Sequence, residues 1–320
     1  MSGSAALPHP ILGLHHVTAT VDDAQADLDF CLDTLGLRLV KKTVNFDNHH
    51  VYHFYYGDER GTPGTIWTTF PYRGRGVAVG TTGVGQIVVT SFSVPRDALP
   101  FWTARLTQRG VPWRAAPNRF GEQSLSTSDP SGLAFELIAT DRDVRTPWTS
   151  GGVTAEAAIR GLHSVTIDVA APGPTVDLLT GVLGFRVVDE EAGRMRLAVN
   201  GDEPGRSLDV VFGTQAPRAA NGLGTVHHVA LAIASAEEQR RLREDLVDRG
   251  VKVTEIRDRQ YFQSIYFREP GGVLLEVATV RPGFTVDEDL SRLGRDLKLP
   301  PWEEPSRSEI ENGLPSVVHR

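Results

Sequence analysis

GLHHVT, at residues 13–18, recurs in the same chain as GLHSVT at residues 161–166. A second segment, LGLRLV at 35–40, recurs as LGFRVV at 183–188 with the same separation. The stretches between the two motifs are therefore equal in length. A repeat at a fixed separation indicates an internal duplication, so these motifs decide the fold before any single helix or strand is assigned.

A second pair of repeats completes the pattern. LTQRGV at 106–111 matches LVDRGV at 246–251, and DPSGLAFE at 129–136 matches EPGGVLLE at 269–276, again with one separation. The chain therefore divides into four similar units, which we place at residues 11–72, 83–140, 159–214 and 224–280.

Each unit begins with an apolar strand, continues through a helix and returns through short β-patterned segments separated by turn residues. Residues 22–35 illustrate the helix, because Leu28, Cys31, Leu32 and Leu35 form one apolar stripe. The predicted order is βαβββ, and the predicted fold class is α+β with four such modules in two halves. We place the halves at 1–145 and 146–320, with a linker at 141–158. The tail from 282 either wraps the surface or stays in solvent.

Strand alternation predicts which side chains face an open cup, because successive side chains point to opposite faces. In the third unit, Val165, Ile167 and Val169 form an apolar face that we assign to the helix side. The equivalent strand of the first unit then turns His16 to the open side. It turns His15 to the helix side.

The same alternation applies to the fourth unit. It places His228, Ala230 and Ala232 on the open side, where the small alanine side chains leave room for a ligand. It turns His227 toward the helix. In the closing strand of this unit, Glu276 faces the opening.

His16, His228 and Glu276 are therefore the predicted metal ligands. Two imidazoles and one carboxylate, with other positions open, form the ligand set of non-haem Fe(II) oxygenases. The open positions admit substrate and dioxygen. A lone buried histidine is more often a hydrogen-bonded core residue, but two His-His doublets at matching strand starts favour a metal site. His53, among aromatic residues, either lines the pocket or only packs.

The other two units supply an internal control. Ser164 stands at the position of His16, Val89 at that of His228, and Glu136 at that of Glu276. Serine and valine do not replace imidazole ligands. We therefore expect one cup with a metal and a second cup without one.

Composition limits the remaining functional classes. The net charge is -7 over 320 residues, without a long basic stripe, which argues against nucleic acid as a partner. No apolar run is long enough for a membrane span, and the first residues do not resemble a signal peptide. The single cysteine, Cys31, is expected to be a small core residue. We predict a cytoplasmic homo-oligomer that acts on a small molecule.

The repeats and ligand positions resemble the vicinal oxygen chelate superfamily, whose members are built from βαβββ modules (glyoxalase/bleomycin-resistance/extradiol dioxygenase fold). Within it, the chain is similar to hydroquinone-type ring-cleaving dioxygenases, including those acting on chlorinated hydroquinones. The resemblance extends to about residue 285. Catechol-type enzymes of the superfamily take a histidine from the third module, where this chain has Ser164. The segments that carry the resemblance are 13–18, 52–58, 158–163, 226–230, 258–262 and 266–272.

The resemblance implies supporting catalytic roles for His15, Thr18, His227, Arg259 and Tyr266. It implies that His227 acts as acid or base, Arg259 stabilises negative charge, and Tyr266 hydrogen-bonds the substrate or bound oxygen. Thr18 and Tyr266 agree with strand alternation. His15 and His227 do not, unless a β-bulge re-aims them.

The expected activity is that of an Fe(II)-dependent dioxygenase that cleaves a para-dihydroxy aromatic ring beside a hydroxylated carbon, with O2 as co-substrate. Mn(II) is the alternative metal. Three alternatives stay open: a catechol-type extradiol dioxygenase, a glyoxalase-like isomerase or epimerase, and a binder of aromatic or quinone compounds without catalysis. The segment closing unit one, residues 65–70, offers no carboxylate, which disfavours the isomerase.

Overall fold

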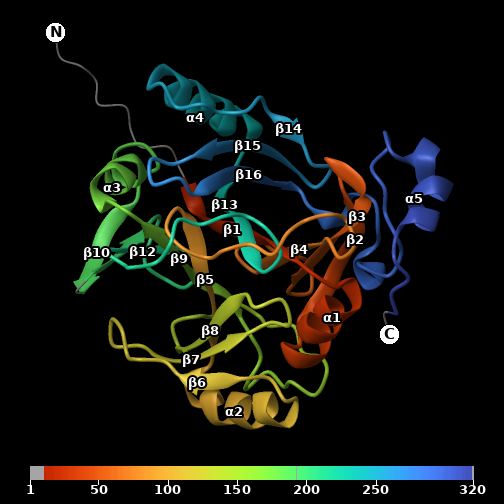
Figure 1. Ribbon diagram of the computed structural model, residues 1–320, viewed down its shortest axis with the longest axis horizontal. Helices are drawn as coiled ribbons and strands as arrows, with labels where there is room; N and C mark the ends of the chain where they lie inside the picture. Colours follow the sequence, from red (N-terminus) through yellow and green to blue (C-terminus); the bar gives the residue numbers. More distant parts are fainter. Residues whose placement is uncertain (1–10, 192, 319–320) are drawn as a thin grey trace.

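The computed structural model describes residues 11–191 and 193–318, and it contains the four predicted βαβββ units (Figure 1). The first unit consists of β1 (Ile11–Val21), α1 (Ala24–Leu28), β2 (Arg38–Asn45), β3 (Asn48–Gly57) and β4 (Ile66–Pro71). The second consists of β5 (Gln86–Val94), α2 (Leu99–Gln108), β6 (Trp113–Ala115), β7 (Gln123–Ser128) and β8 (Ala134–Ala139). The N-terminal residues 1–10, where we expected no signal peptide, lie outside the described residues.

The other two units repeat this order. The third consists of β9 (Gly161–Val169), α3 (Pro172–Gly181), β10 (Arg186–Glu191), β11 (Arg194–Ala198) and β12 (Ser207–Phe212). The fourth consists of β13 (Thr225–Ile233), α4 (Ala236–Asp248), β14 (Arg257–Asp258), β15 (Phe262–Arg268) and β16 (Leu274–Pro282). The prediction of an α+β fold made from four modules is confirmed.

The four units combine into two eight-stranded sheets. One sheet has the order β14-β15-β16-β13-β1-β4-β3-β2, and therefore joins unit four to unit one. The other has the order β10-β11-β12-β9-β5-β8-β7-β6, and joins unit three to unit two. The helices lie at the periphery, with α4 above β15 and α2 below β6 and β7 in Figure 1. Each sheet thus draws on both halves of the chain, and the division at residue 145 stays a prediction.

The predicted helix at 22–35 begins at an aspartate cap and ends in a wider turn. Asp23 accepts a hydrogen bond from the backbone of Ala26, which satisfies a free N–H of the first turn. After α1 the chain continues as a π-helix over Asp29–Thr34. The predicted stripe faces the core, because Leu28, Cys31 and Leu35 are buried. Cys31 is the core residue that the sequence predicts.

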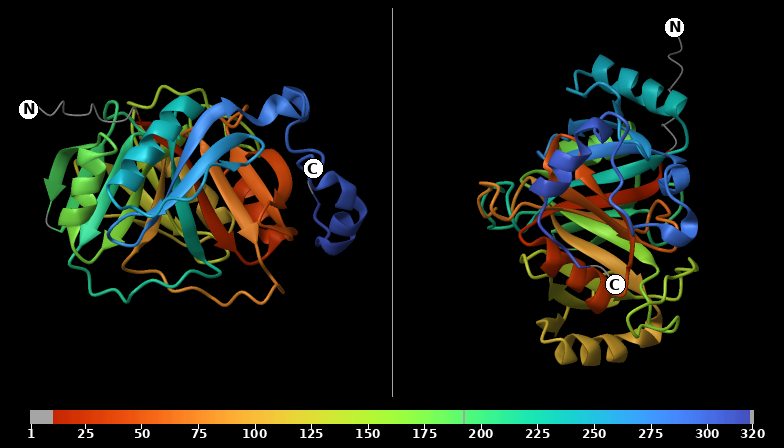
Figure 2. Two further views of the ribbon diagram at one scale, coloured as in Figure 1. Left: turned by 90° about the horizontal axis from the view of Figure 1, so that it is seen from above. Right: turned by 90° about the vertical axis from the view of Figure 1, so that its right-hand side faces the viewer.

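The tail after β16 forms short helical turns and one helix. These are 3-10 turns at Phe284–Val286, Leu290–Arg292 and Glu304–Ser306, followed by α5 (Arg307–Gly313). Figure 2 shows the tail beside the strands of unit one. Two carboxylates of the tail bind the fully buried Lys41 ammonium: Asp287 at 2.6 Å and Glu288 at 2.7 Å.

The tail also corrects one expectation about the cup. We expected Ala230 to leave room for a ligand, but Ala230 lies in an apolar cluster that includes Phe284 of the tail. The ring of Phe284 contacts Tyr55 and Tyr261, with centroids 5.0 and 4.9 Å away. The tail thus contributes an aromatic side chain to the apolar cluster in which Ala230 is buried.

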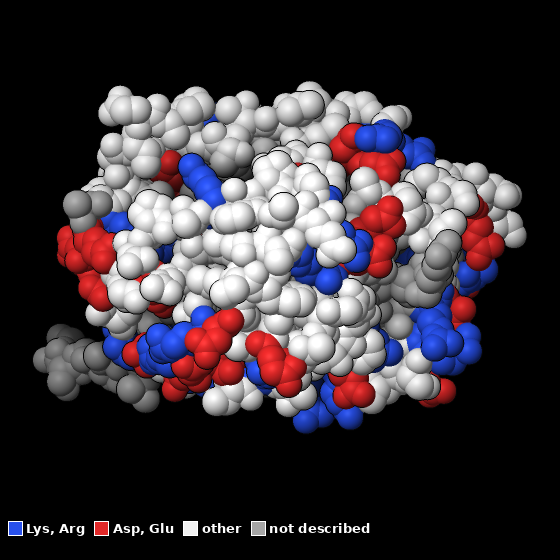
Figure 3. Space-filling view, turned by 90° about the horizontal axis from the view of Figure 1, so that it is seen from below, with Lys and Arg blue, Asp and Glu red and all other residues white. Residues whose placement is uncertain are grey.

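Two surface properties bear on partners. Within the described ranges, no helix is both long and apolar enough to cross a membrane. On the face shown in Figure 3, acidic and basic side chains are interspersed.

Replacing Lys41 with alanine should reduce the free energy of unfolding by about 3–5 kcal/mol, because it leaves two carboxylates near a buried site without their cation. Urea denaturation followed by circular dichroism measures the change. Arg240→Ala is the matched control, because Arg240 pairs with Glu237 and Glu244 on an exposed helix face, and it should leave stability nearly unchanged. Equal effects of the two substitutions would contradict a stabilising role for the buried contacts between Lys41 and the tail.

Candidate metal centre

Three side chains from separate strands converge in the first sheet. His16 lies on β1, His228 on β13 and Glu276 on β16, and these strands are neighbours in the sheet. Nε2 of His16 lies 3.3 Å from Nε2 of His228 and 3.3 Å from Oε2 of Glu276, and Nε2 of His228 lies 2.8 Å from the same oxygen. All three side chains are buried.

These distances suit a common ion. Two donor atoms that each lie about 2.1 Å from one ion at right angles are about 3.0 Å apart. The donor set of two imidazole nitrogens and one carboxylate oxygen suits a borderline divalent metal. Within the described residues, Oε2 of Glu276 accepts no well-formed hydrogen bond although it is buried. A buried carboxylate oxygen in this state is stabilised by a cation. The residues present therefore fit a divalent metal.

The strand pairing explains how both doublets reach the site. β1 and β13 are antiparallel, and the register skips His15 between Leu14 and His16. It skips again at His227, because Thr18 pairs with His228 and Ala19 with Val226. Each skipped residue is a β-bulge, which re-aims a side chain.

The bulges correct the prediction for His15 and His227. Simple alternation turned both toward the helices, and this is wrong. Nδ1 of His15 lies 2.9 Å from Nδ1 of His16, and Nδ1 of His227 lies 2.7 Å from Nδ1 of His228. When Nε2 of a histidine ligates a metal, its Nδ1 carries the proton and donates it outward. The first histidine of each doublet is thus placed to accept this bond.

The electrostatics of the site keep the carboxylate ionised and favour the neutral form of His228. Burial opposes ionisation of Glu276, but His16 and His228 outweigh it and hold the pKa of Glu276 well below its usual range. Burial lowers the pKa of His228. Burial and the adjacent ligand histidine lower the pKa of His15 and of His227 to about 3. Neutral imidazole and ionised carboxylate are the protonation states that bind metal.

A cavity of about 220 Å³ opens onto the three side chains. Polar groups stand on one side of it: Nε of Arg259 donates to the Tyr266 hydroxyl at 3.1 Å, and Nη2 donates to Asp47 at 2.9 Å. Burial raises the pKa of Tyr266, so its phenol stays protonated. The remaining lining includes Thr20, Asn45, Phe46, His53, Tyr55, Phe70, Tyr72, His227 and Phe262. A larger groove of about 1060 Å³ beside α1 contains none of the three candidate ligands.

The sequence did not predict several residues of this cavity. Asp47 fixes Arg259 from a turn between β2 and β3, and Phe262 packs edge-on against His15, at 4.9 Å between ring centroids. His53, which the sequence left open, lines the cavity. Thr18 does not reach it directly, but its hydroxyl accepts a hydrogen bond from Thr68 at 2.9 Å. Strand parity places His53 and Tyr55 on one face of β3.

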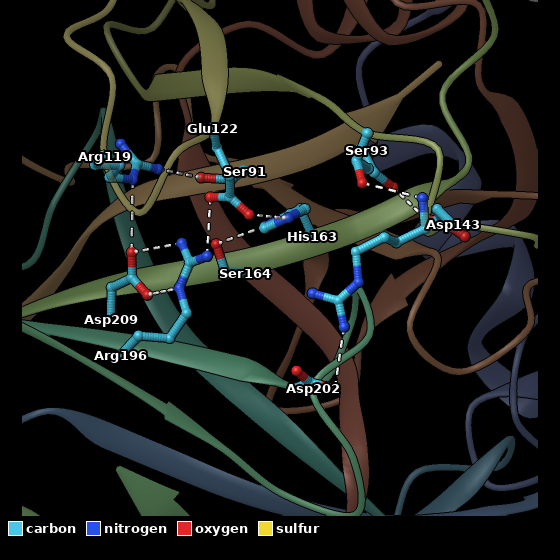
Figure 4. Close-up of polar contacts among 12 residues, drawn as sticks. Ser91, Ser93, Arg119, Glu122, Asp143, His163, Ser164, Arg196, Asp202 and Asp209 are labelled. Carbon is cyan, nitrogen blue, oxygen red and sulfur yellow. Dashed lines mark hydrogen bonds and ion pairs between the residues drawn. The ribbon is translucent and has the colours of Figure 1, made fainter. Parts of the chain in front are cut away.

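The second sheet repeats the strand pairing of this site with different side chains. Figure 4 shows the polar contacts of this second cup. The pairing of β5 with β9 skips Val88 and His163, the positions equivalent to His227 and His15. His163 bonds its neighbour, Ser164, at 3.1 Å, as the histidines of the first sheet do. The bulges therefore belong to the duplicated fold.

Arginines take the place of a cation in the second cup. Arg119 donates to Glu136, the equivalent of Glu276, and lies 3.6 Å from Asp209. Arg196 bridges Asp209 and Glu122, at 2.7 and 2.8 Å. The carboxylates of this cup are thus neutralised by guanidinium groups.

The comparisons with known proteins agree with this architecture. Residues 13–137 and 161–277 match the family model described as Glyoxalase/Bleomycin resistance protein/Dioxygenase superfamily. The chain belongs to this superfamily.

The chain is similar to three known proteins over nearly its whole length. MhqO of Bacillus subtilis (strain 168), provisionally named a ring-cleaving dioxygenase, is 42% identical over 95% of this chain and 96% of its own. Chlorohydroquinone/hydroquinone 1,2-dioxygenase of Sphingobium indicum is 38% identical over 95% of this chain and 96% of its own. A crystal structure of a provisionally named dioxygenase from Bacillus subtilis subsp. subtilis str. 168 superposes with a TM-score of 0.92. The two chains are 41% identical, and the match covers 97% of this chain and 99% of the other.

The contrast between the cups predicts one tightly bound divalent metal per chain. Elemental analysis after anaerobic Fe(II) loading and desalting should give about one equivalent for the unaltered chain. Glu276→Gln should lower this value strongly, because it removes the anionic donor. Glu136→Gln, at the equivalent position of the second cup, should not change it. Two equivalents, or a loss with Glu136→Gln, would contradict the assignment.

Proposed function

We propose that this chain is an Fe(II)-dependent ring-cleaving dioxygenase that acts on para-dihydroxy aromatic compounds, with Mn(II) as the alternative metal. The observation that carries the proposal is the convergence of His16, His228 and Glu276 at the end of an aromatic-lined cavity. Three protein ligands on one side leave room for a substrate oxygen and for O2. The names of the relatives support ring cleavage and, in one case, a hydroquinone substrate.

The volume of the cavity supports a small aromatic substrate. A cavity of 150 Å³ is enough to hold benzene, and about 220 Å³ is present here. Rings of His53, Tyr55, Phe70 and Phe262 provide apolar contact. A single ring with small substituents fits this space.

When bound, Fe(II) would supply Lewis acidity and a route for electrons to pass from the diol ring, which is oxidised, to O2, which is reduced. The residues of the chain supply orientation and charge stabilisation. Arg259, fixed by Asp47, directs positive charge at developing negative charge on the substrate. Tyr266 receives a hydrogen bond from Arg259, so its own hydroxyl proton is available for the substrate. His227 lines the cavity as a neutral imidazole. Because its Nδ1 accepts from His228, its Nε2 carries the proton and can donate a hydrogen bond to a substrate oxygen.

The arrangement does not favour a glyoxalase-like isomerase. In unit four, Ala230 pairs with Glu276 across β13 and β16. The equivalent pair in unit one is Thr18 with Thr68 across β1 and β4. A threonine therefore stands where a second carboxylate ligand would come from, and a three-ligand site results.

The direct test is oxygen uptake by anaerobically Fe(II)-loaded protein with hydroquinone, methylhydroquinone, chlorohydroquinone and catechol in parallel. We expect stoichiometric O2 consumption with the para-diols, and a ring-opened product that contains both oxygen atoms of O2. Glu276→Gln should reduce the rate to background. Full activity in Glu276→Gln would exclude the proposed centre. Tight binding of the diols without O2 uptake would instead indicate a binding protein.

Replacing Tyr266 with phenylalanine should lower kcat by about 10²-fold, as removal of one oriented donor does in other active sites. The KM for the diol should change less, because aromatic contact is preserved. Tyr52→Phe is the control, since the Tyr52 hydroxyl donates to the Pro315 carbonyl of the tail, outside the cavity. Steady-state O2 uptake measures both variants. An unchanged kcat for Tyr266→Phe would remove this residue from the catalytic machinery.

A further inference from the structure

His53 is a polar group of the cavity that the proposed mechanism does not use. It lies on β3, two strands from the ligand strand β1. Neighbouring strands are about 4.8 Å apart, so His53 lies about 10 Å along the sheet from β1. Its ring is only partly buried and lines the same cavity as the candidate ligands.

The ring of His53 is held in place by two aromatic contacts and one hydrogen bond. Its centroid lies 3.9 Å from that of Tyr55 and 4.3 Å from that of Phe70. Nε2 lies 2.8 Å from the Thr68 hydroxyl. A side chain fixed in this way presents its other nitrogen in one direction.

The hydrogen-bond chain determines which nitrogen carries the proton. Thr68 donates its hydroxyl proton to Thr18 at 2.9 Å, so the Thr68 oxygen accepts from His53. Nε2 of His53 therefore carries the proton, and Nδ1 of the neutral ring holds a lone pair. Within the described residues, Nδ1 has no hydrogen-bond partner. Burial, in the first place, lowers the pKa of His53 well below its usual value, which agrees with a neutral ring.

We propose that Nδ1 of His53 accepts a hydrogen bond from the ring hydroxyl that does not bind the metal. This inference rests on the proposed function and extends it to the choice of substrate. A para-diol that places one oxygen at the ligand triad carries its second hydroxyl on the far side of the ring. In the sheet, β3 lies beyond β1 and β4, on the side away from the other two ligand strands, β13 and β16. An ortho-diol carries both oxygens toward the metal and leaves Nδ1 without a donor.

The same geometry gives Thr68 and Thr18 a definite role. Thr68 stands at the position that Glu276 occupies in unit four. Instead of a ligand, it provides the acceptor that fixes the tautomer of His53. Thr18 completes the chain by accepting from Thr68. His53 is thus a specificity-determining residue, and the two threonines position it.

The test compares two ligands that share the metal-binding hydroxyl. Hydroquinone donates a hydrogen bond from its para position, whereas 4-fluorophenol has a substituent of similar size that does not donate. Affinities for the Fe(II)-loaded full chain are measured anaerobically by calorimetry. We expect the unaltered chain to prefer hydroquinone about tenfold, as one net hydrogen bond provides.

His53→Phe keeps the stacked ring but removes the acceptor, and should reduce this preference to about one. His53→Asn can place an amide oxygen near the position of Nδ1, and should retain part of the preference. His50→Phe, at an exposed position of the same strand, should behave as the unaltered chain. Comparing each variant with the unaltered chain cancels the different acidities of the two phenols.

A preference that persists in His53→Phe, or that is missing in the unaltered chain, would overturn the inference. Oxygen uptake separates this outcome from failure of the proposed function. If the unaltered chain cleaves hydroquinone and His53→Phe keeps the preference, only the role of His53 is wrong. If the unaltered chain consumes no oxygen with any diol, the proposed function itself is wrong. Thermal unfolding of His53→Phe and His53→Asn verifies that both are folded.

Discussion

The antiparallel pairing of β1 with β13 is the constraint on which the candidate site depends. It joins the first unit to the fourth across more than 200 residues of chain, since Nε2 of His16 and Nε2 of His228 approach to 3.3 Å. Two of the register shifts in this pairing fall at His15 and at His227. Because each bulge adds a residue, both histidines of a doublet reach the same region. One becomes a candidate ligand, and the other accepts the hydrogen bond that orients it.

The two sheets compensate the negative charge of their buried carboxylates in different ways. In the first sheet, Glu276 faces two imidazoles, and a divalent cation fits between them. In the second sheet, Glu136 faces Arg119, which is part of the chain itself. A buried charge must be paired in either case. The backbone and its bulges are common to both sheets, so the side chains alone decide which cup fits a metal ion.

The sequence predicted the structure correctly where it contains a repeated motif or a regular alternation of side chains along a strand. Repeated motifs located the four units, and alternation brought His16, His228 and Glu276 to one face. Alternation failed at His15 and His227, because a bulge adds one residue and leaves no mark in the residue pattern. Alternation also did not reveal that Ala230 is buried in an apolar cluster that includes Phe284 of the tail. Arg119, Asp47 and Thr68 depend on contacts between strands distant in sequence, which no local pattern contains.

The candidate site requires that three side chains of the first sheet hold one cation. Anomalous diffraction at the iron edge, from crystals loaded anaerobically with Fe(II), measures this directly. We expect one strong peak bounded by Nε2 of His16, Nε2 of His228 and the carboxylate of Glu276, and no peak between Glu136 and Asp209. A peak in the second cup, or none between the first three residues, would show that these side chains do not form the metal site.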